Sequence, residues 1–381
     1  MRFSSFTDLF RLYTLKDVLQ RVSIPVNVEE NKLYYQIGIR SHSKGIFHKE
    51  AETGKQIGNK RIFWIEPNCL ILNIVFAWEQ AVAKTSEKEV GMVASHRFPM
   101  YKVLNNSLDY IVDFFKTEKG KQLLQMASPG GAGRNKTLNQ DFFLNSKIYL
   151  PSLNEQLKTS NLIELIEDRI ETQIKIIDDC LSYRNAIVDY FFESLSSNWR
   201  QVKLSNILKE YSELHVKDNS IIHATLSKEG IYPKTDRYDR DFLVKDEEKK
   251  YKVSHLNDIC YNHANLKFCV ITRNTFGDCI ISPIYITFTI NNNCLPKFIE
   301  LLVTRKQFIT QARKYEQGTV YERMAVNSSD LLSMNVLIPS LSIQQKIVDI
   351  VDTIDNKITN EKELLNLYKT QKDYLLKNMF I

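Results

Sequence analysis

The sequence predicts an α+β protein in which two strand-rich globular parts are separated by two long antiparallel helices that form a coiled-coil spacer. Three observations lead to this prediction. The chain contains an internal repeat of the kind that gives pseudo-two-fold symmetry, and each copy contains short apolar runs typical of strands. Each copy also ends in a long run with helical periodicity. With 381 residues, the chain is long enough for two domains of ordinary size.

The internal repeat is clearest in two short segments. KIYLPSLNEQ covers residues 147–156 and NVLIPSLSIQ covers 335–344, so Pro151 in the first copy corresponds to Pro339 in the second. Upstream matches at slightly different offsets, such as FRLYTLKDVL with WRQVKLSNIL, indicate one scaffold with different loops. The repeat therefore predicts four segments, which are globular parts at 1–150 and 199–338 and long helices at 151–198 and 339–381.

Strand-like runs rich in β-branched and aromatic residues recur in both globular parts. The first part contains NKLYYQIGI, KRIFWI and CLILNIVF, and the second contains LKFCVITRN and CIISPIYITFTI. A shorter helix is expected just before each long helix, at 106–126 and at 295–314. Trp78 and Tyr285 are expected to be core or scaffold aromatics.

Each long helix is expected to begin at the serine that follows the proline. Ser152 is a good N-cap residue, and Glu155 stands at the spacing of a capping box. Apolar residues then recur at steps of three and four, which is typical of a coiled-coil seam. The first set is Ile163, Ile166, Ile170, Ile174, Ile177, Leu181, Val188, Phe191 and Leu195, and the second is Ile347, Val351, Ile354, Ile358, Leu365, Tyr368, Leu375 and Met379. A helix of about 40 residues is roughly 60 Å long, so the two are expected to pack on each other.

Charge is divided unevenly between the helices and the rest of the chain. Residues 152–195 contain nine acidic and four basic residues, and residues 340–381 contain six of each. Because the whole chain has a formal net charge of +6, the remaining parts carry +11. Basic globular parts indicate a polyanionic partner, most often nucleic acid, although a solvated lysine-rich surface has the same composition.

The composition is that of a soluble protein in a reducing compartment. No stretch approaches the 18 or more apolar residues of a membrane span, and the N-terminal residues do not resemble a signal peptide. The six cysteines form no CxxC pair and no cluster with histidine. We therefore expect reduced thiols in a cytoplasmic protein and no bound metal.

The repeated order of strand-rich part, Pro-Ser cap and long helix resembles the specificity subunit of Type I restriction-modification systems, and the resemblance covers about 10–195 and 199–380. It implies that each strand-rich part is a target recognition domain that reads one half of a bipartite site in double-stranded DNA. It also implies that the helices set the spacer and dock two methyltransferase subunits. Those partners would use S-adenosylmethionine, and separate restriction-translocase subunits would use ATP and Mg, so the chain itself is expected to hold no cofactor.

Candidate DNA-binding residues are the basic and polar side chains of the globular parts, because lysine and arginine suit phosphates and fixed polar groups suit base edges. In the first part they are Arg40, His42, Ser43, Lys44, His48, Lys49, Lys60, Arg61, Ser95, His96 and Arg97. In the second they are Lys228, Tyr232, Lys234, Arg237, Tyr238, Arg240, Arg273 and Asn274. For any one of them an ordinary exposed loop position remains an alternative.

Motifs for chemistry are weak in this sequence. There is no Pro-Pro pair for an adenine methyltransferase element and no GxGxxG, and TGKQIGNK at 53–60 has Gln56 where a phosphate loop needs a hydroxyl. SPGGAGRN at 128–135 is interpreted as a turn or linker, and DFLVKDEEKK at 241–250 as a solvated charged turn rather than a nuclease element. We therefore expect a non-catalytic subunit; the alternatives are a tandem coiled-coil adaptor that binds only proteins and a self-sufficient nuclease or methyltransferase.

Overall fold

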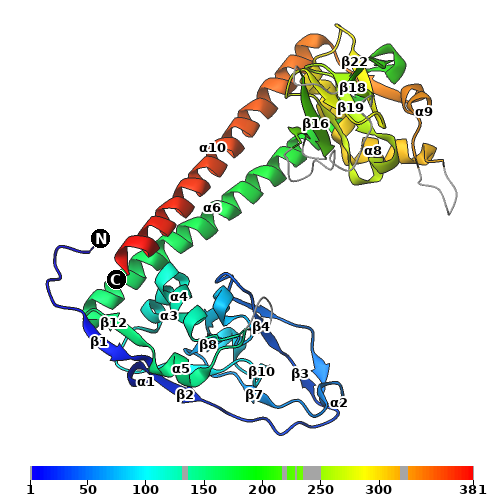
Figure 1. The fold of residues 1–381 in the computed structure, drawn as a ribbon. Coiled ribbons are helices and arrows are strands. Elements are labelled where there is room, and N and C mark those ends of the chain that lie inside the picture. The colour runs from blue at the N-terminus through cyan, green and yellow to red at the C-terminus, as the bar shows by residue number, and fades with distance from the viewer. Residues whose placement is uncertain are drawn as a thin grey trace. The chain divides into compact units, whose positions relative to one another are not determined.

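A computed structural model describes residues 2–130, 136–216, 221–227, 230–234, 250–317 and 325–380. The chain divides into two compact units (Figure 1). Unit 1 comprises Met1–Lys175 with Lys362–Ile381, and unit 2 comprises Ile176–Glu361. Each of the two long helices therefore contributes one part of its length to each unit.

Unit 1 contains a four-stranded antiparallel sheet in the order β2–β11–β8–β9. Its strands are β2 (Leu19–Val22), β8 (Leu70–Leu72), β9 (Val82–Lys84) and β11 (Met100–Val103). The two-stranded pairs are β1 (Arg11–Thr14) with β12 (Lys147–Leu150), β3 (Leu33–Tyr34) with β6 (Glu52–Thr53), β4 (Ile37–Ile39) with β5 (Ile46–His48), and β7 (Ile62–Trp64) with β10 (Val93–Ser95). The helical elements are α1 (Leu15–Val18), α2 (Gly54–Ile57), η1 (Ala77–Glu79), η2 (Glu87–Glu89), α3 (Leu108–Lys116), α4 (Glu118–Met126) and α5 (Gln140–Asn145).

Unit 2 repeats the four-stranded sheet and one of the two-stranded pairs, and its additional strands form one five-stranded sheet instead of separate pairs. A four-stranded antiparallel sheet has the order β14–β22–β19–β20, with β14 (Leu208–Tyr211), β19 (Ile259–Asn262), β20 (Ile271–Arg273) and β22 (Tyr285–Ile290). The pair β13 (Arg200–Lys203) with β23 (Asn335–Ile338) matches β1 with β12. The additional sheet, β15–β18–β21–β16–β17, contains β15 (Leu214–Val216), β16 (Ile222–Ser227), β17 (Gly230–Pro233), β18 (Lys250–Ser254) and β21 (Cys279–Ile281). The helical elements are η4 (Ser196–Asn198), η5 (Leu204–Asn206), η7 (His263–Phe268), α7 (Pro296–Thr304), α8 (Lys306–Ala312), η8 (Arg313–Tyr315) and α9 (Ser328–Ser333).

The shorter helices predicted at 106–126 and 295–314 are each present as two consecutive helices, α3–α4 and α7–α8. The break in unit 1 is at Thr117, whose backbone is extended (φ −76°, ψ 165°). Its hydroxyl donates to Phe114 O at 2.7 Å and accepts from Gly120 N at 3.1 Å, so one side chain ends α3 and caps α4. A Cβ at Gly120 would lie 2.2 Å from Phe114 O, which explains the glycine in this tight corner.

The two long helices, α6 (Leu153–Ser194) and α10 (Leu341–Met379), confirm the helical prediction. In unit 1 they are joined by an ion pair of 2.6 Å between Glu167 and Lys372. In unit 2 a second ion pair joins Arg184 to Asp355. Leu375 and Met379 share the unit 1 core cluster with residues early in α6, whereas Ile347 and Val351 share the unit 2 cluster with residues late in α6. Within each unit the helices are therefore antiparallel.

Two details of the helix prediction are wrong. Glu155 does not close a capping box, because both of its carboxylate oxygens accept hydrogen bonds of 2.7 Å from the Arg2 guanidinium. Ile174 and Leu181 are exposed, whereas Gln173 and Cys180 occupy the more buried positions between Ile166 and Val188. Steps of three and four residues fit Gln173 as well as Ile174, and Cys180 as well as Leu181. Choosing the more apolar residue of each pair therefore selects the exposed residue instead of the more buried one.

Candidate DNA interface

The first group of predicted DNA-binding residues lies on the hairpin of β4 and β5 in unit 1. Arg40 N donates to Gly45 O at 3.0 Å and closes the turn. We call residues 41–45 the tip. The tip contacts η1 through His42 N, which donates to Glu79 O at 2.6 Å, and through Ser43 N, which donates to Gln80 O at 2.9 Å. The tip is therefore held at two successive residues.

Two further predicted groups, Lys60–Arg61 and Ser95–Arg97, come together through strand pairing. Ser95 is paired with Ile62 in the antiparallel β7–β10 ladder, and His96 N donates to Arg61 O at 3.2 Å. A parallel bridge between Gln36 and Val93 aligns β10 with β4. Because parallel neighbours end on the same side, the residues after β10 and the residues after β4 lie at one edge.

We call the exposed cationic or titratable side chains at this edge the basic edge: Arg40, Lys44, Lys60, Arg61, His96 and Arg97. In the described part of the chain, none of these six side chains makes an ion pair or a hydrogen bond. Arg40 instead lies 5.0 Å from the centroid of the Phe47 ring. Unpaired cations at one edge are what phosphate binding requires.

Two other predicted residues of unit 1 lie away from this edge. His48 and Lys49 are exposed at the other end of β5. The His48 ring contacts the buried Glu89 carboxylate, with 3.1 Å between Nε2 and Oε1. Burial alone would raise the pKa of Glu89, but hydrogen bonds from Ser86 and His48 lower it. His48 is therefore engaged within the domain, whereas Lys49 makes no side-chain contact of this kind among the described residues.

In unit 2 the structure describes four of the predicted residues, and they differ in exposure and in hydrogen bonding. Tyr232 is 49% exposed on β17, and the nearby Lys234 is half-buried. Arg273 is already engaged, because its guanidinium donates to Asn257 at 2.7 Å and to Glu300 at 3.0 Å. Asn274 is fully buried. Lys228, Arg237, Tyr238 and Arg240 lie outside the described residues.

Asn274 has a structural task that accounts for its burial. Its amide donates to Ser254 Oγ at 3.0 Å and to Gly277 O at 2.8 Å, and its side-chain oxygen accepts from Phe276 N at 2.9 Å. The side chain thus organises the turn between β20 and β21. With no exposed surface, it is left out of the interface proposed below.

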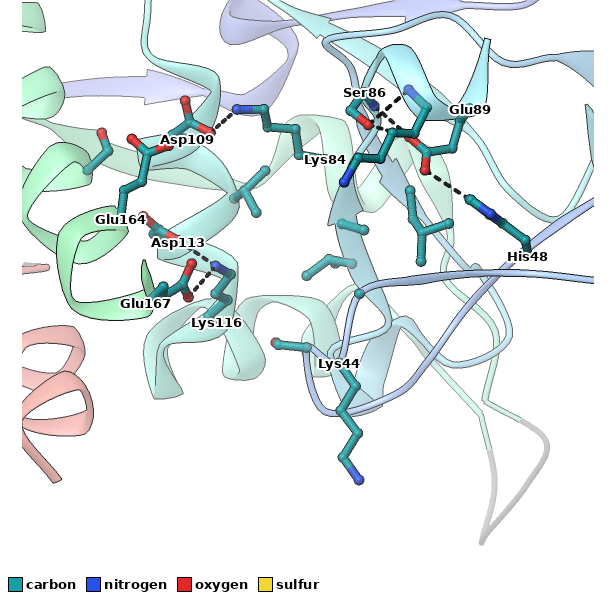
Figure 2. Close-up of a pocket in the computed structure, with 18 residues that line it drawn as sticks. Lys44, His48, Lys84, Ser86, Glu89, Asp109, Asp113, Lys116, Glu164 and Glu167 are labelled. Carbon is teal, nitrogen blue, oxygen red and sulfur yellow. Dashed lines mark hydrogen bonds and ion pairs between the residues drawn. The ribbon is translucent and has the colours of Figure 1, made fainter. Parts of the chain in front are cut away.

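A cleft of about 680 Å³ lies on the other side of the hairpin, between it and helices α3 and α6 (Figure 2). Figure 2 shows four carboxylates together on the helical wall, from Asp109, Asp113, Glu164 and Glu167, and it shows Lys44 pointing away from them. Lys116 is paired with Asp113 at 2.8 Å and with Glu167 at 3.1 Å. Lys84 likewise pairs with Asp109 at 2.6 Å, so most of the carboxylates on this wall are neutralised by lysines that line the same cleft.

The Asp113 carboxyl is the most perturbed group of this wall. Burial raises its pKa to about 6, although the nearby Lys116 ammonium acts in the opposite direction. For Glu167 burial would also raise the pKa, but Lys116 and Lys372 hold it below its ordinary value. The network joins α3, α6 and α10 within unit 1, so it stabilises the packing of the helices.

One cation near the edge was missed by the sequence reasoning. Lys136 lies 5.2 Å from the Trp78 ring, whose indole N–H donates to Val75 O at 3.2 Å. Trp78 is thus the scaffold aromatic that the sequence predicts, and its exposed face holds a lysine. A lone lysine after a glycine-rich segment gave no signal in the sequence.

The segment 53–60, compared above with a phosphate loop, forms a four-residue helix instead. Thr53 N donates to the side-chain oxygen of Gln56 at 2.7 Å, which completes a capping box. Among the described residues no group of three or more His, Cys, Asp and Glu side chains is arranged to hold a metal ion. Within that same part of the chain, none of the helices has the length and apolar character that crossing a membrane requires.

The fold and the basic edge together define a duplicated α+β protein with a cationic surface suited to a polyanion. Residues 198–368 match the family model of the Type I restriction modification DNA specificity domain. This match confirms the resemblance to Type I specificity subunits that the sequence indicates. No curated protein matches the sequence significantly.

Solved structures match over nearly the whole chain. One is the HsdS subunit from Thermoanaerobacter tengcongensis, with 13% identity, a TM-score of 0.51, and 96% of this chain and 95% of that chain covered. Another is the Type I restriction-modification S subunit from M. genitalium, with 13% identity, a TM-score of 0.57 and coverages of 100% and 99%. A third comes from a study of complex assembly in the Type I R-M system, with 13% identity, a TM-score of 0.64 and coverages of 98% and 97%. At this identity the matches establish the fold.

Proposed function

We propose that the chain is the DNA sequence-specificity subunit of a Type I restriction-modification complex and acts in the cytoplasm. Each strand-rich domain, at 1–150 and at 199–338, reads one half of a bipartite site in double-stranded DNA. The observation that carries the proposal is the match of residues 198–368 to a DNA specificity domain whose architecture occurs twice in the chain.

The basic edge supports DNA binding by the first domain. Its six exposed side chains are unpaired among the described residues, whereas other lysines of unit 1 are neutralised, such as Lys84 by Asp109 at 2.6 Å and Lys102 by Glu66 at 3.1 Å. Cations without protein partners can neutralise phosphates and release the counterions condensed on DNA, which supplies much of the affinity for DNA.

The helices at 151–198 and 339–381 are proposed to set the spacer between half-sites and to dock two methyltransferase subunits. Large apolar side chains on their outer faces support a docking role, because Tyr183 and Tyr190 on α6 are 59% and 53% exposed and Leu367 on α10 is 65% exposed. Catalysis is assigned to partners: adenine methylation with S-adenosylmethionine to the methyltransferase subunits, and cleavage with ATP and Mg to restriction-translocase subunits.

The deciding experiment is single-molecule detection of methyladenine in DNA from cells with and without this chain. We expect a bipartite methylated motif that disappears on deletion and returns on complementation. Persistence of the motif after deletion would contradict the proposal. In a filter-binding assay, a complete absence of salt-sensitive DNA binding would favour the protein-only adaptor instead.

A further inference from the structure

The tip of the β4–β5 hairpin has an unusual backbone. His42 and Ser43 are consecutive residues in the left-handed region, with φ of 59° and 54°, and Gly45 follows at 77°. Gln80, which accepts from Ser43 N, is itself left-handed at φ 58°. For side chains such as serine and glutamine this region is unfavourable.

This conformation is held in place by contacts on several sides. Ser41 Oγ donates to Glu79 Oε2 at 2.9 Å, in addition to the two backbone bonds already described. The Gln80 amide in turn donates to Phe115 O at 3.0 Å and to Thr117 O at 3.2 Å, where α3 ends. The tip is thus clamped, through Gln80, to the helical core of unit 1.

Holding the tip in this position leaves one buried polar group unsatisfied. Among the described residues, the buried Ser43 hydroxyl has no hydrogen-bond partner. Strained backbone of this kind persists where the surroundings over-determine it, and it is concentrated at functional sites. The strain leaves His42 and Lys44 exposed at a fixed position, two and four residues after Arg40 of the basic edge.

We propose that the tip is the base-reading element of unit 1 and that His42 is a specificity-determining residue for its half-site. The inference rests on the proposed function. A two-stranded ribbon fits the major groove, and an imidazole at a rigid tip can donate to or accept from base edges there. The surrounding Arg40, Lys60, Arg61 and Arg97 are left for phosphates, which position the domain without reading sequence.

The test compares His42→Gly with Arg97→Ala in the purified full chain, using a pool of duplexes with randomised positions. Glycine adopts the left-handed backbone freely, so the first variant removes the imidazole and keeps the turn. We expect His42→Gly to lose about 5- to 150-fold discrimination at one or more positions of a single half-site. Arg97→Ala should weaken binding to every sequence equally, so that the discrimination between sequences stays the same.

Two further variants separate side chain from backbone. Ser43→Gly relieves strain while keeping His42, so its sequence preference should match that of the parent chain. His42→Asn also tolerates the left-handed backbone, and its preference at the same positions should change rather than vanish. Melting temperatures and retained binding to unselected DNA show which variants are folded.

The outcomes are distinguishable. If the parent chain selects no sequence from the pool, the proposed function itself fails. If the parent chain selects a bipartite sequence and both His42 variants select the same one with the same discrimination, the tip does not read bases. Uniform weakening of all sequences by His42→Gly would likewise overturn the inference, because it would make His42 a phosphate contact.

Discussion

Gln156 and Gln344, which occupy equivalent positions in the two copies of the repeat, make the same two hydrogen bonds in their respective units. Each side-chain amide donates at 3.0 Å to the carbonyl oxygen of the proline that precedes its long helix. Each side-chain oxygen accepts from a backbone N–H at the start of a shorter helix, Ser107 N at 2.9 Å or Leu295 N at 2.8 Å. Ser107 and Leu295 are separated by the same offset as the two glutamines, so the repeat is preserved at the level of single hydrogen bonds.

Replacing Gln344 with leucine should therefore destabilise unit 2 substantially. The proline carbonyl and the Leu295 N–H would both lose their partner, and each unsatisfied buried group costs about 1–3 kcal/mol. We expect the free energy of unfolding to fall by about 2–6 kcal/mol. Urea unfolding can be followed by the fluorescence of Trp199, which lies in unit 2, after Trp64 and Trp78 are changed to phenylalanine.

Gln345→Leu is the matched control for this prediction. Gln345 is the next residue along the chain, and its exposed side-chain amide donates only to Asp349 on the same helix, at 2.7 Å. The change should alter stability by less than about 0.5 kcal/mol. Equal effects of the two substitutions would show that the paired glutamines do not hold the repeat together.

The sequence predicts the duplicated architecture well because its evidence is local or periodic. A fixed offset at Gln156 and Gln344 identifies the repeat, and steps of three and four identify the helices. A further correspondence appears only in three dimensions. The ring centroids of Phe380 and Tyr110 are 4.7 Å apart in unit 1, and those of Phe192 and Phe298 are 5.2 Å apart in unit 2. By the offset of the repeat, Tyr110 corresponds to Phe298 and Phe192 corresponds to Phe380.

The candidate site is less predictable because strand pairing over long separations creates it. No local signal brings Arg61 beside His96, since only the β7–β10 ladder does so. Asn274 shows the opposite error. A polar residue beside an arginine looks like a surface loop, yet the glycine that follows at Gly277 signals a turn in which the asparagine side chain is used internally.

Asp355 gives a prediction about the helix pair in unit 2. It accepts from Arg184 at 3.2 Å and from Lys297 at 3.0 Å. Burial would raise its pKa, but these hydrogen bonds hold it below its ordinary value. Asp355→Asn would remove the carboxylate charge that pairs with Arg184 and the nearest of the carboxylates around Lys297, so we expect a loss of roughly 1–3 kcal/mol at pH 7 in urea unfolding.

The loss of stability caused by Asp355→Asn should become smaller as the pH falls. A carboxyl whose pKa is lowered by folding stabilises the protein above its unfolded pKa, about 3.9, and this contribution disappears as the pH falls through the folded pKa. The difference between the parent chain and Asp355→Asn should therefore shrink below about pH 4. Asp352→Asn is the control, since this residue is exposed and lies 3.9 Å from Lys297.

Asp113 in unit 1 predicts the opposite pH dependence. Burial raises its pKa to about 6, so between about pH 3.9 and 6 the folded chain keeps a proton that the unfolded chain releases. Stability from this group therefore falls as the pH rises through that window. From pH 4 to 7, Asp113→Asn should gain up to about 3 kcal/mol relative to the parent chain. Urea unfolding followed by Trp64 and Trp78 fluorescence measures this, and a constant difference would contradict it.

The basic edge predicts how salt controls DNA binding. Changing both Lys60 and Arg61 to alanine should weaken binding to every sequence, because neither side chain is held by a partner within the described residues and both are free to neutralise phosphates. The slope of log K against log salt concentration should become shallower by about 0.9 for each phosphate that the variant no longer neutralises. Lys175→Ala removes one exposed cation that is already paired with Glu171 at 2.7 Å, so it should leave the slope unchanged. Filter binding at several salt concentrations measures all three proteins, and equal slopes for all of them would mean that this edge faces away from DNA.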